Sequence, residues 1–110
     1  MPKGIMVVQS RPSDPAREDE YNHWYSNTHL PEIRAVPGFV TARRYRVHDG
    51  GAVAADPSAY SYLAIYEIDA DDLSGPVNEL RARSAAGQTH GSDVLQTDPP
   101  PVVTLYELIE

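Results

Sequence analysis

The chain has 110 residues, enough for one compact domain with a modest hydrophobic core. Its formal net charge of −7 disfavours nucleic acid or an anionic membrane as partner, because both require clustered Lys and Arg. The absence of cysteine excludes disulfides and thiolate chemistry. Since no stretch is apolar enough for a signal peptide or a membrane span, we expect a soluble cytoplasmic protein forming a single domain over residues 1–110.

The first third of the chain predicts a strand followed by a helix. The apolar run from Ile5 to Val8 is typical of a short strand. Asp14 and Pro15 predict a helix N-cap with proline at the first helical position, and the carboxylates at 18–20 complement the helix dipole. We expect this helix to run to about Thr28, because the residue before a proline resists the α conformation and Leu30 precedes one.

The rest of the chain predicts three more strands and a second helix. The expected order is a further helical turn at 31–35, a strand at 39–47, a loop at 48–58, a strand at 60–68, a helix with Leu73, Val77, Leu80 and Ser84 on one face, a connector, and a last strand at 102–109. The resulting β-α-β-β-α-β order predicts an α+β, ferredoxin-like fold, in which both helices cover one face of a four-stranded antiparallel sheet.

The predicted strand at 60–68 is largely apolar on both of its faces. Tyr62 and Tyr66 share one face, while Leu63 and Ile65 share the other. A sheet with one solvated face should alternate cleanly, and two helices cover only one face. We therefore expect a homodimer through the sheet faces, the alternative being a monomer that tolerates an apolar surface.

Aromatic residues dominate one side of the predicted first helix. At 100° per residue, Tyr21, Trp24, Tyr25, Thr28 and His29 share an arc of about 140°, with His29 at its border. His23 lies on the opposite side and should be solvated. Because these two histidines diverge, we expect no metal site.

His29 is the candidate for acid–base chemistry. The negative end of a helix dipole favours imidazolium, so a histidine at the helix end, half shielded by aromatic rings, would titrate near neutrality and could transfer a proton. The alternative is a histidine that only caps backbone carbonyls at a kink.

The aromatic residues form either a core or the wall of a ligand cleft. Tyr21, Trp24 and Tyr25 from the helix would join Tyr62, Tyr66 and Tyr45 from the strands, a mixture suited to an aromatic or polyketide-like substrate. The sequence does not decide which strand face meets the helices. The arginines at 43, 44 and 46 could pair with Glu32 or Glu67, or one of them, assigned to Arg44, could bind a carboxylate or enolate.

The segment "EYNHWYSNTHLPEIRAVPGF" resembles the signature of the EthD-like group of the dimeric α/β-barrel superfamily. The residues that carry the resemblance are Tyr21, Trp24, His29, Pro31 and Pro37-Gly38. It implies a dimer of ferredoxin-like subunits whose sheets form a barrel, with a ligand cleft between sheet and helices. The superfamily includes cofactor-free monooxygenases of aromatic polyketides, polyketide cyclases, muconolactone isomerases and haem-degrading enzymes.

Two functional hypotheses follow. In the first, a cofactor-free enzyme moves a proton with His29 while Tyr25 or Tyr66 donates a hydrogen bond to the oxyanion. Trp24 stacks on the substrate there, and the remaining substrate-binding residues are Tyr21, Tyr62 and Arg44. In the second, the same cleft holds a hydrophobic metabolite without converting it. Haem binding through His29 is a third, weaker alternative.

Overall fold

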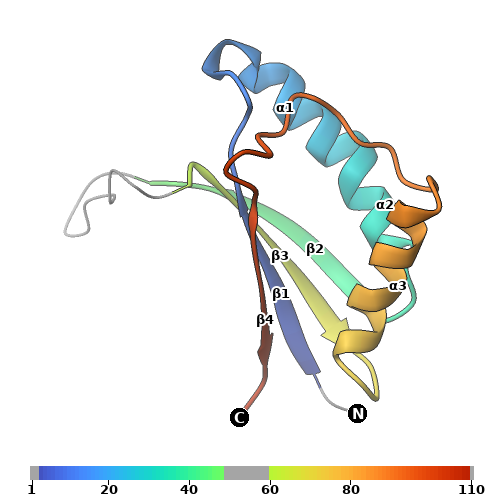
Figure 1. Cartoon of the computed structure of the whole chain (residues 1–110). Coiled ribbons are helices and arrows are strands. Elements are labelled where there is room, and N and C mark those ends of the chain that lie inside the picture. Colours follow the sequence, from blue (N-terminus) through green and yellow to red (C-terminus); the bar gives the residue numbers. More distant parts are fainter. Residues whose placement is uncertain (1–2, 49–59, 110) are drawn as a thin grey trace.

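The computed structural model describes residues 3–48 and 60–109, so most of the loop predicted at 48–58 lies outside the described residues. The strands are β1 (Lys3–Ser10), β2 (Phe39–Arg46), β3 (Tyr62–Asp69) and β4 (Val102–Glu107). They form an antiparallel sheet in the order β2-β3-β1-β4, with the helices on one face (Figure 1). This arrangement confirms the predicted ferredoxin-like fold. No helix within the described residues is long and apolar enough to cross a membrane.

The first helical region is longer and more continuous than predicted. A 3₁₀ turn (Pro15–Arg17) leads into α1 (Glu18–Trp24), then a π-helical turn (Tyr25–His29), then α2 (Leu30–Arg34). The predicted N-cap is confirmed, since the Asp14 carboxylate accepts a hydrogen bond from the amide of Ala16 at 2.9 Å. The predicted interruption at His29 is wrong. The helix widens into the π-helical turn just before Pro31 and then continues as α2.

The second predicted helix is α3 (Ser74–Ala85). Leu73, Val77 and Leu80 pack against the core and are partly buried, whereas Ser84 is exposed. The connector at 86–101 then runs beside α2 and α1 before it enters β4 (Figure 1). It is joined to the end of β1 by a bridge between Pro12 and Leu95.

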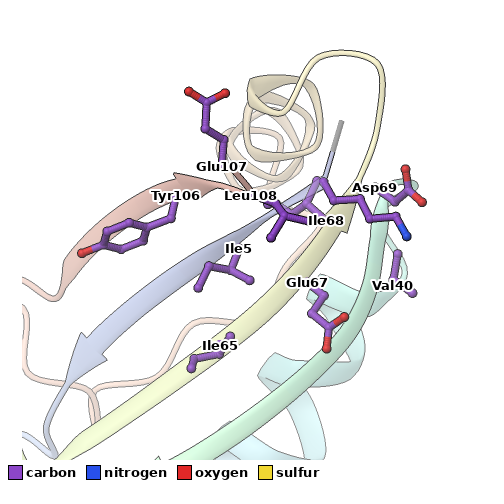
Figure 2. A pocket seen from close by; sticks show the side chains of 11 residues that line it. Ile5, Val40, Ile65, Glu67, Ile68, Asp69, Tyr106, Glu107 and Leu108 are labelled. Atoms are coloured by element: carbon purple, nitrogen blue, oxygen red, sulfur yellow. The ribbon is translucent and has the colours of Figure 1, made fainter. Parts of the chain in front are cut away.

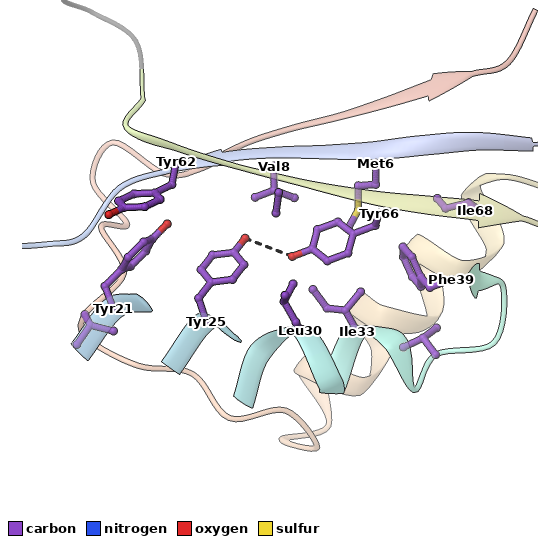
Figure 3. Close-up of a cluster of buried hydrophobic side chains, with 13 residues drawn as sticks. Met6, Val8, Tyr21, Tyr25, Leu30, Ile33, Phe39, Tyr62, Tyr66 and Ile68 are labelled. Atoms are coloured by element: carbon purple, nitrogen blue, oxygen red, sulfur yellow. Dashed lines mark hydrogen bonds between the residues drawn. The ribbon is translucent and has the colours of Figure 1, made fainter. Parts of the chain in front are cut away.

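One face of each central strand supplies the hydrophobic core. On β3, Tyr62, Ala64, Tyr66 and Ile68 point toward the helices and are buried. They pack against buried side chains of the first helical region (Figure 3). The alternation settles which strand face the tyrosines occupy: they lie under the helices.

The other face of the sheet is largely apolar, and none of the described helices covers it. Val40, Tyr45 and Tyr106 on this side are 59%, 47% and 53% exposed. Figure 2 shows Ile5 and Ile65 along the floor of a hollow of about 420 Å³ on this open face. The expectation that Tyr45 joins the helix-facing aromatics is wrong, because Tyr45 pairs with Leu63 and both point to the open face.

Candidate functional site

The π-helical turn brings Trp24 and His29 together. Leu30 donates its backbone amide to the carbonyl of Tyr25, five residues earlier, which is the hydrogen bond that defines a π turn. In a regular α-helix, residues five apart point about 140° away from each other. Here the two rings stack, with centroids 4.8 Å apart and planes inclined by 20°. The local widening therefore makes an indole–imidazole pair that an α-helix would separate.

His29 is a partly buried, neutral imidazole. Besides Trp24, its ring meets that of Tyr25 edge-on at a centroid distance of 4.9 Å. Burial lowers the pKa of His29 to about 4, the Glu32 carboxylate opposes this change, and the Arg44 guanidinium adds to it. The expected titration near neutrality is thus wrong, because His29 lies inside a continuing helix and its partial burial disfavours the charged ring. At pH 7 the ring can accept a proton.

Two tyrosines of the first helical region and one of β3 fill the space between helices and sheet. Tyr21, Tyr25 and Tyr66 are 0%, 2% and 0% exposed. Tyr66 donates a hydrogen bond to the hydroxyl of Tyr25 at 3.3 Å (Figure 3), and the hydroxyls of Tyr21 and Ser10 are 2.5 Å apart. Burial raises the pKa of all three phenols, so they remain protonated donors at neutral pH. The residues expected to line a cleft are therefore packed together here as core.

Arg44 joins β2 to the first helix over these rings. Its guanidinium carbon lies 4.6 Å from the ring centroid of Tyr25 and within 5.4 Å of the rings of Tyr21 and Tyr62. It donates to the side chains of Asn22 at 2.9 Å and Ser26 at 3.0 Å. The predicted ion pair with a glutamate is made by Arg43 and not by Arg44. The guanidinium of Arg43 lies 3.7 Å from the carboxylate of Glu67.

Tyr62 links the aromatic core to polar groups at the start of α1. Its hydroxyl donates to the carboxylate of Glu18 and accepts from the side-chain amide of Asn22 at 3.2 Å. Sequence reasoning missed this role of Glu18, which it assigned only to the helix dipole. No local pattern reveals this contact, because Glu18 and Tyr62 are 44 residues apart in sequence.

The connector provides the remaining contacts of the Trp24–His29 pair. The Trp24 indole donates to the backbone carbonyl of His90 at 3.0 Å. The His90 amide in turn donates to the carboxylate of Glu32, at 2.9 and 3.0 Å from its two oxygens. Sequence reasoning missed both partners, because the segments lie 58 to 66 residues apart.

Three hollows formed by the described residues do not include Tyr25, His29 or Tyr66. One is the hollow on the open sheet face, and another, of about 200 Å³, lies at the end of the β2–β3 pair and includes Tyr62. The third, of about 550 Å³, lies between α1 and the connector. It is lined by Arg17, Asp19, Glu20, His23, Trp24, Ser92 and Val94.

The histidines do not gather into a metal centre in the part of the chain that the structure describes. No group of three or more His, Asp or Glu side chains there is placed to hold a metal ion. His23 is exposed, as predicted, and its ring nitrogen Nδ1 accepts a hydrogen bond from the side-chain amide of Asn27 on the outer surface of the helix.

Comparisons with known proteins identify the fold. No protein-family model matches the sequence, and no curated protein sequence matches it significantly. Over 100% of this chain and 98% of its own, a proposed monooxygenase from Shewanella loihica PV-4 has a similar structure, with a TM-score of 0.59 at 16% identity. An ethyl tert-butyl ether degradation (EthD) family protein from Bacillus halodurans C-125 is similar over 99% of this chain and 100% of its own, with a TM-score of 0.54 at 17% identity.

A third similar structure contains a bound ligand. It is the monooxygenase from the gene ActVA-Orf6 of Streptomyces coelicolor in complex with nanaomycin D, with a TM-score of 0.50 at 17% identity, covering 97% of this chain and 88% of its own. The class of fold is thus ferredoxin-like. Within that class, the fold of the chain is similar to that of the EthD family protein, as its sequence motif predicts.

Proposed function

We propose that this protein is a cofactor-free enzyme in which His29 accepts a proton from a small aromatic or polyketide-like substrate. One observation carries the proposal: the imidazole of His29 is stacked on Trp24, partly buried, and neutral at pH 7 with a pKa of about 4. A neutral imidazole has one nitrogen that accepts. The similarity in fold to the nanaomycin D complex supports the substrate class.

The proposed step removes a proton from a carbon or oxygen conjugated to a carbonyl group. The C–H or O–H bond breaks, an N–H bond forms on His29, and the electron pair moves to the substrate oxygen as an enolate or phenolate. An anion beside the imidazolium raises the pKa of His29, which offsets its low value in the free protein. Isomerisation, cyclisation and reaction with dioxygen can all start from such an anion.

Neighbouring side chains would stabilise the anion and hold the ring system. Tyr25 or Tyr66 would donate to the oxyanion, since burial raises the pKa of both phenols and keeps their protons in place. Trp24 would stack on the substrate. Arg44 is close enough to lower the pKa of His29, and its positive charge would favour the anion by the same electrostatic interaction. Tyr21 and Tyr62 would complete the substrate-binding surface.

The test is a pair of histidine variants assayed on a substrate found by thermal-shift screening of aromatic and polyketide-like compounds. Replacing His29 with Gln should lower turnover by about 10² to 10⁴-fold, the usual contribution of general acid–base catalysis. His23→Gln, on the exposed side of the same helix, should leave turnover unchanged. Wild-type turnover in His29→Gln would remove the assigned role.

The second candidate is a binding or accessory protein that holds a hydrophobic metabolite without converting it. Its motive is that the sequence carries no second strong catalytic signature beside His29. Incubation of the protein with excess ligand separates the two candidates. Product formed in many-fold excess over protein rejects the binding-only function, and ligand recovered intact rejects the enzyme.

We also infer that the open sheet face is covered by a second copy of the chain. Exposed apolar side chains on that face, including Tyr45 and Tyr106, support a two-fold dimer. Light scattering should give twice the 12.1 kDa mass of the chain. Ile65→Lys on the open face should yield monomer, whereas Val103→Lys, on the opposite face of β4, should not. A wild-type monomer at micromolar concentration would reject the dimer.

A further inference from the structure

The segment 87–91 of the connector is tied to the first helical region through one residue, His90. Its backbone amide donates to the Glu32 carboxylate, its ring nitrogen Nδ1 lies 3.0 Å from the same carboxylate, and its carbonyl accepts from the Trp24 indole. Glu32 is largely buried, with a side chain 17% exposed, whereas the side chain of His90 is 82% exposed. The carboxylate of Glu32 therefore binds the exposed segment 87–91 through the backbone amide of His90.

This segment has a glycine at each end. Gly87 has φ +74° and closes α3 in a Schellman motif, in which Gln88 donates to the carbonyl of Arg83 and Gly87 to that of Ser84. At Gly87 and Gly91 an added Cβ would meet no atom within 4 Å. Neither end is therefore confined by packing, and both glycines allow the wide range of backbone angles that a hinge needs.

The chain beyond Gly91 is held firmly, in contrast. Val94 is 3% exposed and packs in the core. The amide of Ser13 donates to the carbonyl of Val94 at 2.7 Å, and the amide of Gln96 donates to the carbonyl of Arg11 at 3.0 Å. Movement of the connector is thus confined to the short stretch between the two glycines.

The segment 87–91 contacts the first helical region on both sides of His29. It is attached there at Trp24 and Glu32, and His29 lies between them in sequence, stacked on Trp24. A further hydrogen bond, between the hydroxyls of Thr89 and Ser84 at 3.0 Å, ties the segment to α3. The hollow of about 550 Å³ reaches Trp24 from the side and is bounded by Ser92 and Val94, just past Gly91. Lifting the segment would extend this hollow toward the imidazole.

We propose that residues 87–91 form a lid over the Trp24–His29 pair, that Glu32 latches this lid closed through His90, and that its release admits the substrate to His29. This inference rests on the proposed function for the identity of the ligand. The latch itself can be tested without substrate, because Trp24 is the only tryptophan and reports directly on the lid.

The first test is acrylamide quenching of Trp24 fluorescence in the full chain. Removing the carboxylate in Glu32→Ala should raise the quenching constant about two-fold, since local opening exposes the indole without global unfolding. The matched control is Glu79→Ala, which deletes a carboxylate on α3 that pairs with Arg83 at 3.3 Å and should leave quenching unchanged. Equal quenching in wild type, Glu32→Ala and Glu79→Ala overturns the latch.

The second test is an NMR titration of His29 in Glu32→Gln, which keeps the size of the side chain. Two charged groups act on His29: Glu32 on α2 raises its pKa and Arg44 on β2 lowers it. If the substitution only removes the charge, the pKa of His29 falls below about 4. If the lid opens, water reaches the ring and the pKa rises toward 6.5. A rise supports the lid and a fall overturns it.

The outcomes for the lid and for the proposed function are distinguishable. Retained turnover in His29→Gln together with raised Trp24 quenching in Glu32→Ala would remove the catalytic role and keep the lid. Lost turnover in His29→Gln together with unchanged quenching in Glu32→Ala would keep the catalytic role and remove the lid.

Discussion

The aromatic residues of the first helical region divide into two groups with different environments. Tyr21 and Tyr25 are fully buried beside Tyr66, and their hydroxyls find partners inside the protein. Trp24 and His29 stack on each other at the edge of the same core and are only partly buried. The difference teaches that one aromatic arc can have two environments: its phenols fill the interior, while the indole and imidazole lie at the edge of the core.

The largest expected effect on the free energy of unfolding comes from substitution in the fully buried group. Tyr66→Ala should lower the free energy of unfolding by about 4 kcal/mol, because it opens a large cavity in a fully buried site. Trp24→Ala, although it removes a larger side chain, should cost about half as much, since the indole is partly exposed. Chemical denaturation measures both. Equal losses would mean that Trp24 is core and not edge.

The second effect is a dependence of stability on pH that comes from His29. Its pKa is lowered from 6.5 to about 4 in the folded protein, so between these values the unfolded chain binds the proton more readily. The stabilisation that comes from the neutral His29 ring is therefore complete above pH 6.5. It is lost as the pH falls toward 4, which lowers the free energy of unfolding by up to about 3 kcal/mol. Denaturation at a series of pH values should show a shallower slope for His29→Gln. Identical slopes for variant and wild type would contradict the burial of the ring.

A smaller loss of stability is expected when the hydrogen bond between the hydroxyls of Tyr21 and Ser10 is removed. Tyr21→Phe should cost about 1 to 2 kcal/mol, because it leaves the hydroxyl of Ser10, 2% exposed, without its partner. The double variant with Ser10→Ala should recover part of the loss, since both polar groups are then gone. A double-mutant cycle checks this, and strictly additive losses would argue against the hydrogen bond.

The smallest expected effect is the difference in stability between alanine variants of two neighbouring arginines. Arg44→Ala should cost about 1 kcal/mol, since it removes contacts with three tyrosine rings and three hydrogen bonds to the helix. Arg43→Ala removes only an exposed ion pair with Glu67 and should cost less than about 0.5 kcal/mol. Thermal unfolding of the two variants makes the comparison. A reversed order would show that Arg44 does not join β2 to the helix.

Local patterns in the sequence were sufficient to predict the order of elements. The Asp14 cap and the β-branched and aromatic strand residues depend on neighbours in sequence, and the structure confirms them. The face of β3 that meets the helices could not be predicted, because Tyr62 and Tyr66 on one face and Leu63 and Ile65 on the other are equally compatible with burial. Only the packing of the whole chain decides that choice.

The candidate site was predictable in its residues but not in its geometry. The spacing of Trp24 and His29 drew attention to both, yet a regular helix separates them and the π turn unites them. The shift in hydrogen bonding just before Pro31 has no periodic signal. The contact of Glu32 with His90 joins residues 58 apart in sequence, and the charge pattern does not reveal it.

The central claim is that His29 is a partly buried, neutral imidazole held against Trp24. An NMR titration of the His29 ring in the wild-type protein tests it most directly. We expect a midpoint near 4, with the Trp24 indole resonances shifting in the same transition, because the two rings are stacked. A midpoint at or above 6.5 would show a ring in contact with water or with the negative end of a helix, and would contradict the account.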